Sequence, residues 1–576
     1  MRTLVAILLC VVSAVSAVSA VSAVTGSNDT ENTFEVRTPL GSVRGSFLTT
    51  RLGKKIYSFR GIRYAEPPVG QQRFQQAVPV KPWSDVFDAT EEGPSCPRYL
   101  GEIVSEDCLR LNVYTTKLPS QNPAEDKDMG RSVLVFFHPG GFYGFSGQSY
   151  IEGPQYLLDQ DIILVTVNYR LSTLGFISTG DSLAPGNLGL KDQVEALRWV
   201  KRNIVAFGGN SNSVTISGYS AGSWSVILHM VSPMSRGLFH RAIAMSGSPT
   251  TPEPLPTEQK HLAKKQAELL GCPTDTTGNM LLCLNTKTID EYVETLGKFS
   301  EWHGDPILVW SPVVEPEVHG RERFLPAQPA DLIREGNFHQ VPLITGVTKD
   351  EFGGVVVGLL EESKKGNDST FQDLNQNWER IAPISFQYER NTNRSREISN
   401  ALKEFYFKGK PISKDNVDGL AHMYADSIII FPEHRLVNLV AAASKEPVYY
   451  YQFAYQGRYS FATWPDTKKP YGVVHHDDML YLFYVSFFPY FEEGSPEIPT
   501  VERMTAMWAN FVKTGEPIPK DNPTFKDVVW EVFTPSNKKY LQITDNLTIK
   551  SGLYEDRMKE WEKLFPLKPL SQSTKH

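Results

Sequence analysis

Long apolar runs are absent after the first 23 residues, so the sequence predicts no integral membrane segment in the mature chain. Dense basic runs are absent as well, and 58 Lys and Arg against 65 Asp and Glu leave a formal net charge of -7, which argues against nucleic acid as a partner. Neither CxxC nor HExxH occurs, so we expect no metal site of those types. No linker rich in Pro, Gly or Ser divides the chain. One large domain over residues 33–566, followed by a polar tail at 567–576, is the simplest interpretation.

The first residues have the pattern of a secretory signal peptide. Arg2 gives a positive start, residues 4–12 are apolar, and four Val-Ser-Ala triplets over residues 12–23 offer small residues for cleavage. A retained membrane anchor is the alternative, but the apolar part is shorter than the ~20 residues that a spanning helix needs. We predict a signal peptide over residues 1–23 and a soluble, secreted protein, with the oligomeric state left open between a monomer and a weak dimer.

Cysteine is scarce, and its spacing suits an oxidising compartment. There are 5 cysteines, of which Cys10 lies in the predicted signal peptide. The other four allow three connectivities, but the pairing of neighbours is the simplest, so we predict two short-loop disulfides, Cys96 with Cys108 and Cys272 with Cys283. Four N-x-S/T sequons predict glycosylated surface sites, at Asn28, Asn367, Asn393 and Asn546.

Short β-branched or aromatic runs bounded by turn residues suit buried strands of a parallel sheet. They occupy residues 133–137, 162–167, 214–217, 341–345 and 448–453. Residues 190–207 carry apolar side chains near helical spacing and predict a helix. Strands that alternate with helices indicate an α/β architecture, with a large, mostly parallel, twisted sheet flanked by helices. We expect the polar stretch 361–400, with its two sequons, to be a surface excursion rather than core.

The most informative segment is residues 218–222, which read Gly-Tyr-Ser-Ala-Gly. This G-x-S-x-G string follows an apolar run and precedes a plausible helix over residues 223–231. A strand, a sharp turn and a helix are what a nucleophile elbow requires, with glycines that allow the backbone to crowd the serine. The pattern predicts Ser220 as a nucleophile; a Gly/Ser turn without chemistry is the alternative.

A serine hydroxyl needs a base and an orienting acid elsewhere in the chain. In α/β-hydrolases these follow the nucleophile in the order acid, then histidine. His475 lies in a loop that runs into a short apolar segment, where it can reach the edge of the sheet. The acid candidate is Glu351, just past the expected strand 341–345. From the residues alone, Asp350 is nearly as good a candidate for the acid as Glu351.

Several strings in the right order resemble the type-B carboxylesterase and cholinesterase family over nearly the whole mature chain. They are residues 59–68 (FRGIRYAEPP), 105–109 (SEDCL), 186–193 (GNLGLKDQ) and 206–210 (AFGGN), together with the elbow. The resemblance implies an α/β-hydrolase fold of one large domain. It also implies Ser220 as nucleophile, Glu351 as triad acid and His475 as base, with no metal or organic cofactor. It further implies the disulfides Cys96–Cys108 and Cys272–Cys283, and an ion pair between Arg60 and Glu106.

The same resemblance places an oxyanion hole after the strand 133–137, with N–H groups of Gly140, Gly141 and Ala221 as donors. Pro139 replaces the first glycine of the family's string; proline has no N–H, but that position is not one of the donors. Bulky residues beside these strings are candidate walls of an apolar substrate pocket. They are Phe142, Tyr143, Tyr219, Trp224 and Trp310.

Two departures from the usual residues of this family narrow the range of expected substrates. Tyr219 stands where many members carry Glu, and the Cys96–Cys108 loop holds no tryptophan to bind choline, so choline esters are disfavoured. The pattern is most similar to secreted insect carboxylesterases, which include juvenile-hormone and odorant-degrading enzymes, although juvenile-hormone esterases typically have Gln at the position of Tyr219. The expected partner is a small-molecule ester. The alternatives are a non-catalytic cholinesterase-like adhesion protein and a lipase.

Overall fold

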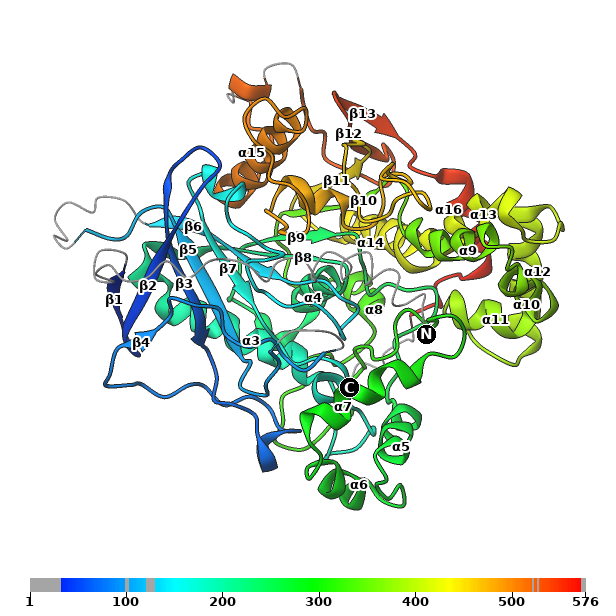
Figure 1. Ribbon diagram of the computed structural model, residues 1–576, viewed down its shortest axis with the longest axis horizontal. Coiled ribbons are helices and arrows are strands. Elements are labelled where there is room, and N and C mark those ends of the chain that lie inside the picture. Colours follow the sequence, from blue (N-terminus) through cyan, green and yellow to red (C-terminus); the bar gives the residue numbers. More distant parts are fainter. Residues whose placement is uncertain (1–32, 99–102, 121–129, 521–522, 526–527, 571–576) are drawn as a thin grey trace.

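A 13-stranded twisted sheet runs through the protein in the computed structural model, which describes residues 33–98, 103–120, 130–520, 523–525 and 528–570 (Figure 1). The strands are β1 (Phe34–Thr38), β2 (Gly41–Thr49), β3 (Lys55–Arg63), β4 (Phe87–Asp88), β5 (Arg110–Thr115), β6 (Arg131–Phe137), β7 (Ile163–Val167), β8 (Gly209–Tyr219), β9 (Arg241–Met245), β10 (Leu343–Thr348), β11 (Val448–Phe453), β12 (Lys539–Ile543) and β13 (Leu547–Ser551). Their order is β1-β2-β3-β5-β7-β6-β8-β9-β10-β11-β12-β13, with β4 beside β2. From β7 to β12 all neighbours run parallel, and the pairs toward both edges, except β2 with β4, are antiparallel.

Helices flank this sheet, as the α/β pattern predicts (Figure 1). They are α2 (Ser172–Phe176), α3 (Leu188–Asn203), α4 (Ala221–Val231), α5 (Lys260–Leu269), α6 (Thr277–Leu284), α7 (Ile289–Thr295), α8 (Pro329–Arg334), α9 (Gly354–Lys364), α10 (Ser369–Gln376), α11 (Trp378–Ser385), α12 (Asn393–Phe407), α13 (Val417–Ala425), α14 (Phe431–Ala443), α15 (Ile498–Thr514) and α16 (Glu555–Leu564). Throughout the described ranges, no helix has both the length and the apolar character needed to cross a bilayer.

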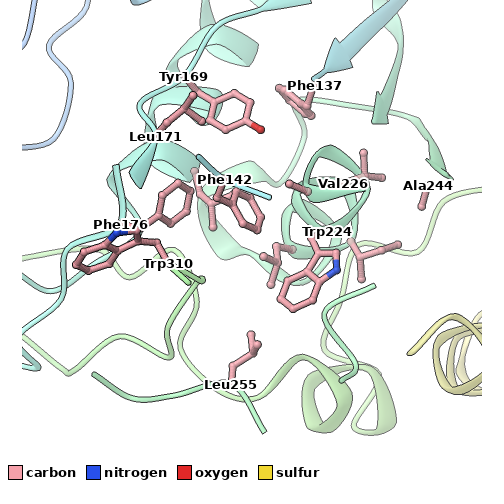
Figure 2. Packing of buried hydrophobic residues seen from close by; sticks show 14 of the residues in the cluster. Phe137, Phe142, Tyr169, Leu171, Phe176, Trp224, Val226, Ala244, Leu255 and Trp310 are labelled. Carbon is pink, nitrogen blue, oxygen red and sulfur yellow. The ribbon is translucent and has the colours of Figure 1, made fainter. Parts of the chain in front are cut away.

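Alternate residues of the central strands feed two cores, one on each face of the sheet. On β6, Val133, Val135 and Phe137 join the first core, part of which Figure 2 shows, whereas Leu134 and Phe136 join the second. Buried residues of α3 and α4 belong to the first core, and those of α15 belong to the second. The sheet is therefore covered on both faces, which explains the near-continuous apolar runs of its parallel strands.

The predicted strands at 133–137, 162–167, 214–217, 341–345 and 448–453 correspond to β6, β7, β8, β10 and β11, and the bounds of β11 match the prediction. The predicted helix 190–207 appears as α3 followed by a 3₁₀ turn, Ile204–Phe207. The expectation of a surface excursion over residues 361–400 is wrong. This stretch holds α10, α11 and the start of α12, and its apolar residues recur at helical spacing and are buried in the first core. These residues are Phe371, Leu374, Trp378 and Ile381.

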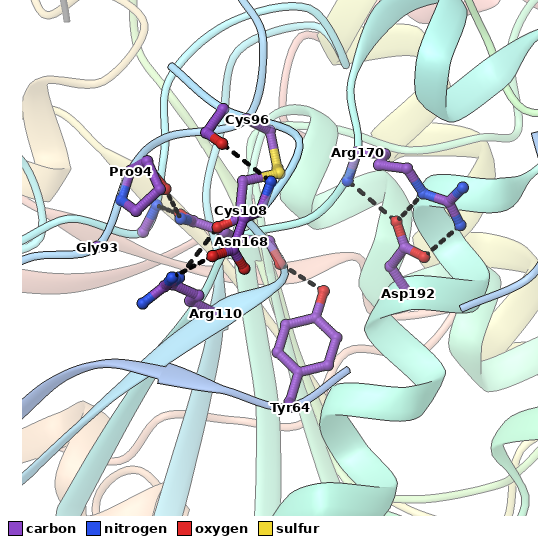
Figure 3. Close-up of a disulfide and its surroundings, with 12 residues drawn as sticks. Tyr64, Gly93, Pro94, Cys96, Cys108, Arg110, Asn168, Arg170 and Asp192 are labelled. Carbon is purple, nitrogen blue, oxygen red and sulfur yellow. Dashed lines mark hydrogen bonds and ion pairs between the residues drawn. A yellow bond between two sulfur atoms is a disulfide. The ribbon is translucent and has the colours of Figure 1, made fainter. Parts of the chain in front are cut away.

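Both predicted disulfides are present, Cys96–Cys108 and Cys272–Cys283. Figure 3 shows the first of them near Asn168, whose side chain donates to the Pro94 carbonyl 3.2 Å away. Of the predicted sequons, Asn367, Asn393 and Asn546 are exposed, and Asn28 lies outside the described residues, as does the signal peptide. Glycosylation at these positions stays a prediction.

The expected ion pair between Arg60 and Glu106 is wrong. Glu106 instead receives two hydrogen bonds from the Arg73 guanidinium, at 2.6 and 2.9 Å. Arg60 lies 3.6 Å from a carboxylate oxygen of Glu92. Arg73 is only 6% exposed and also donates to backbone carbonyls of residues 284, 285 and 287, so the chain's three-dimensional course decides which arginine meets Glu106.

Candidate active site

Ser220 occupies a sharp turn between β8, which ends at Tyr219, and α4, which begins at Ala221. Its backbone φ is 55° and its ψ is -115°, a strained conformation for a residue with a Cβ atom. The Ser220 N–H donates to the carbonyl of Met245 on β9 at 2.8 Å, which ties the turn to the next strand. The side chain is partly exposed at the carboxyl edge of the sheet, as the predicted elbow requires.

Glycine is required on both sides of Ser220 because other backbone segments approach closely. A Cβ atom on Gly222 would lie 1.9 Å from the Phe137 carbonyl oxygen, and one on Gly218 would lie 2.3 Å from the Gly222 backbone. Gly247, beyond β9, packs directly on the backbone of Ser220, where a Cβ atom would lie 2.5 Å from the serine carbonyl oxygen. These contacts explain the glycines of the G-x-S-x-G string as packing requirements.

Glu351 lies three residues beyond the end of β10 and is 1% exposed. One of its carboxylate oxygens is 2.5 Å from Nδ1 of His475, and the other accepts the Thr348 N–H at 2.8 Å. The neighbouring Asp350 accepts the Val473 N–H at 2.9 Å instead. Of the two carboxylates that the sequence left open, Glu351 is therefore the one that contacts the imidazole.

The imidazole of His475 is held between two aromatic rings. Phe352 stacks on it with ring centroids 4.6 Å apart, and Tyr219 meets it edge-on at 5.0 Å. Its Nε2 atom is buried and makes no hydrogen bond within the described parts of the chain. Since Tyr219 directly precedes Ser220, this contact brings the base loop to the serine turn, and a buried nitrogen without a partner is suited to exchange a proton there.

The predicted oxyanion loop follows β6 and adopts a conformation that glycine favours. The φ angles of Gly140 and Gly141 are 110° and 59°. Over the residues that the structure describes, neither of their N–H groups donates to another residue. The N–H of Ala221 belongs to the first turn of α4, where backbone donors have no partner within the helix. A role of these three N–H groups as an oxyanion hole stays a prediction.

His138 and Tyr169 support this loop from behind. The two rings stack with centroids 4.2 Å apart, and the Tyr169 hydroxyl donates to the His138 carbonyl at 2.9 Å. Burial lowers the pKa of His138 to about 3, so the ring is neutral at physiological pH. Neutral packing, rather than charge, fixes the loop next to Pro139.

The predicted pocket residues lie in different surroundings. Phe142 contacts Trp224 edge-on at 6.2 Å and Phe176 at 4.8 Å, and Trp310 belongs to the same core (Figure 2) and contacts Phe299 at 5.6 Å. The Tyr143 ring lies over Gly141, where an added Cβ atom would be 2.6 Å from the ring. Tyr219 is fully buried in the second core, on the opposite face of the sheet. A role of these residues as pocket walls stays a prediction.

Sequence reasoning missed two residues beside the site. Phe352, which stacks on the base, could have been suspected from its position next to the acid candidate. Glu433 on α14 is fully buried and accepts the Gly247 N–H at 3.1 Å and the Thr345 hydroxyl at 2.7 Å. Burial is the main cause that raises its pKa to about 8, and the charge of Glu351 adds to it. No sequence pattern marks Glu433, because its partners Gly247 and Thr345 lie far from it in the sequence.

Comparison with known proteins gives a consistent assignment. The model of the Carboxylesterase family matches residues 32–561. Esterase FE4 of Myzus persicae is 39% identical over 505 residues, which cover 84% of this chain and 85% of the relative. Juvenile hormone esterase of Tribolium castaneum is 35% identical over 523 residues, 86% of each chain. The crystal structure of juvenile hormone esterase from Manduca sexta with OTFP covalently attached superposes with a TM-score of 0.81 at 28% identity, covering 93% of this chain and 100% of that one. This chain belongs to the carboxylesterase family and has its α/β-hydrolase fold.

Proposed function

We propose that this protein is a secreted serine esterase that hydrolyses carboxylic esters of hydrophobic or small organic molecules. The observation that carries the proposal is the 2.5 Å contact between Glu351 and Nδ1 of His475, whose Nε2 atom is buried without a partner. The base loop contacts Tyr219, the residue before the strained Ser220. An activated serine needs this combination of a sharp turn, an oriented base and a buried acid.

In the first half of the reaction, Oγ of Ser220 attacks the ester carbonyl carbon while Nε2 of His475 takes the hydroxyl proton. The carbonyl oxygen becomes an oxyanion that accepts hydrogen bonds from Gly140, Gly141 and Ala221. When the carbon–oxygen bond to the alcohol breaks, the imidazolium returns its proton to the leaving alkoxide. Glu351 stabilises the imidazolium and fixes the ring's tautomer without taking the proton.

In the second half, water attacks the acyl-serine and gives one proton to Nε2 of His475. Collapse of the second tetrahedral intermediate breaks the bond to Ser220, which recovers its proton from the imidazolium. The carboxylic acid then leaves. The family resemblance implies no metal ion or organic cofactor, and the steps above need none: His475 exchanges protons with Ser220, the leaving alcohol and water.

Apolar esters fit the surroundings of the site. Phe142, in the loop that follows β6, contacts Trp224 edge-on at 6.2 Å, and Trp310 lies in the same core (Figure 2). Neutral Tyr219 and the lack of tryptophan in the Cys96–Cys108 loop argue against choline esters. The juvenile hormone esterases named above make juvenile hormone the first substrate to examine, and the resemblance to insect carboxylesterases adds odorant and xenobiotic esters. The predicted signal peptide, two disulfides and exposed sequons support secretion.

The test is hydrolysis of p-nitrophenyl esters with acyl chains of two to twelve carbons, together with organophosphate labelling located by mass spectrometry. We expect Ser220→Ala to lose at least about 10³-fold in kcat and all labelling. Ser211→Ala, at the far end of the same strand, is the matched control and should retain both. Full activity of Ser220→Ala would exclude this nucleophile. A parent protein that neither hydrolyses esters nor reacts with the organophosphate would favour the adhesion alternative, and preference for emulsified triglyceride would identify a lipase.

A further inference from the structure

Tyr219 contacts both His475 and His476 of the base loop, and its ring lies 4.9 Å from that of His476. Its ring meets the His475 imidazole edge-on, with centroids 5.0 Å apart at 61°, and its hydroxyl accepts the backbone N–H of His476 at 2.8 Å. The two partners lie 257 residues apart along the chain. One side chain, adjacent to the candidate nucleophile, thus reaches both the candidate base and the backbone that follows it.

Both ends of this link are strained. Ser220 has a φ of 55° and His476 a φ of 82°, and both carry side chains that disfavour the left-handed region. Such conformations persist only where the surrounding structure over-determines them. The Tyr219 side chain lies between the two strained residues, and each of them adjoins a triad member or is one.

The surroundings of the Tyr219 hydroxyl explain how it can act as an acceptor without carrying a charge. Burial raises the pKa of Tyr219 well above its ordinary value, and the carboxylates of Asp478 and Glu351 raise it further. Asp478 lies two residues past His476, is fully buried and accepts the Tyr451 hydroxyl at 3.0 Å. The phenol therefore stays protonated, and the His476 N–H meets a neutral oxygen in a region that already holds buried carboxylates.

We propose that Tyr219 is a positioning residue that sets the spacing between nucleophile and base by holding the backbone of His476 against the serine turn. This inference rests on the proposed function, because it assigns a role relative to Ser220 and His475. Tyr219 lies in the second core, whereas Phe142 and Trp224 lie in the first, so we expect its loss to change the chemical step and not substrate binding.

Tyr219→Phe tests the proposal because it keeps the ring and removes only the hydroxyl. Tyr156→Phe is the matched control: Tyr156 is 1% exposed, lies in the same core, and its hydroxyl accepts the Phe491 N–H at 2.9 Å. For p-nitrophenyl acetate we expect Tyr219→Phe to lower kcat about 10- to 100-fold with KM within about twofold. The rate constant of organophosphate labelling should fall by the same factor. Tyr156→Phe should leave both rate constants within about twofold of the parent.

Labelling stoichiometry separates positioning from folding, because misfolded molecules lower the reactive fraction and leave the rate constant of the remainder unchanged. The proposal is overturned if Tyr219→Phe keeps the parent rate constant per reactive site, whatever its reactive fraction, or if only KM changes. A parent protein that is not labelled at Ser220 would overturn the proposed function as well, and that failure appears before any variant is compared.

Discussion

The ring of Phe352 lies nearly flat on the imidazole of His475, with centroids 4.6 Å apart and planes inclined by 22°. The hydrogen bond from Nδ1 to Glu351 fixes one point of the imidazole, and the stacked ring restricts its rotation about that point. The imidazole of His475, the proposed base, is thus oriented by packing as well as by Glu351. Removal of the acid's charge should therefore leave the ring close to its present place.

For Glu351→Gln we expect kcat to fall about 10³- to 10⁴-fold with little change in KM, because an amide cannot stabilise the imidazolium or select the required tautomer. Asp350→Asn is the neighbouring control, since Asp350 contacts the Val473 N–H and not the imidazole. We expect kcat of Asp350→Asn to fall by less than about tenfold. Steady-state hydrolysis of a p-nitrophenyl ester measures both variants, and the reverse ranking would make Asp350 the acid.

The oxyanion loop should tolerate a change at Pro139 and not at Gly140. A Cβ atom on Gly140 would lie 2.2 Å from the Gly144 carbonyl oxygen, at a φ of 110° that side chains disfavour. We expect Gly140→Ala to lower kcat at least about 10²-fold, the cost of a displaced oxyanion donor. Pro139→Gly removes no donor, and His138 stays stacked on Tyr169. We therefore expect kcat of this variant to fall by less than about tenfold. Equal losses in the two variants would mean that the proline ring shapes the hole.

The ion pair of Arg73 with Glu106 should stabilise the folded protein. Arg73→Met strands a largely buried carboxylate and should lower the free energy of unfolding by about 3–5 kcal/mol. The control is Arg44→Met, whose pair with Glu35 is 41% and 45% exposed and should contribute less than about 1 kcal/mol. Urea unfolding of the two variants compares these values. A similar small loss in both would show that Glu106 is rehydrated when Arg73 is absent.

Glu433 should make stability depend on pH. Its pKa rises from 4.5 to about 8 in the folded protein, mainly through burial, so folding favours the protonated carboxyl. That stabilisation is complete below pH 4.5 and is lost as the pH rises through about 8. In Glu433→Gln, the amide can accept the Gly247 N–H and donate to the Thr345 hydroxyl. The unfolding midpoint of the variant should equal that of the parent at pH 5 and should be higher than that of the parent at pH 9.

Buried Asp477 and Asp478 also have raised pKa values, of about 8 and about 7, but both are present in parent and variant. The difference between the two proteins therefore reports Glu433 alone. A difference between the two unfolding midpoints that stays constant from pH 5 to pH 9 would contradict this prediction.

Local sequence signals predicted the elements on which the site is built. The run at residues 448–453 reads as a buried strand because β11 is covered on both faces, and the glycines of the elbow are required by contacts within a few residues or with the adjacent strand. The polar stretch 361–400 misled because sequons and charged residues outnumber its apolar positions. The spacing of Phe371, Leu374 and Trp378 was nevertheless a helical signal that composition alone obscures.

Long-range contacts could not be predicted in the same way. Arg60, Arg63 and Arg73 all lie upstream of Glu106, within or close to residues 59–68, and only the path of the chain brings Arg73 and not Arg60 to it. The contacts of Tyr219 and Glu433 also join segments far apart in sequence, so no periodicity reveals them. Motifs identify reacting groups, whereas the groups that support them depend on tertiary packing.

β10 pairs directly and in parallel with β11, although a long segment of the chain separates the two strands. Residues 349–447 leave the sheet after the first of these strands, build the helices α9 to α14, and return to the second. The register of the two strands is set by their own hydrogen bonds, so it does not depend on the length or sequence of the outer helices α9 to α13. Residues 354–425, which hold α9 to α13, can therefore vary without displacing Glu351, which lies between β10 and α9.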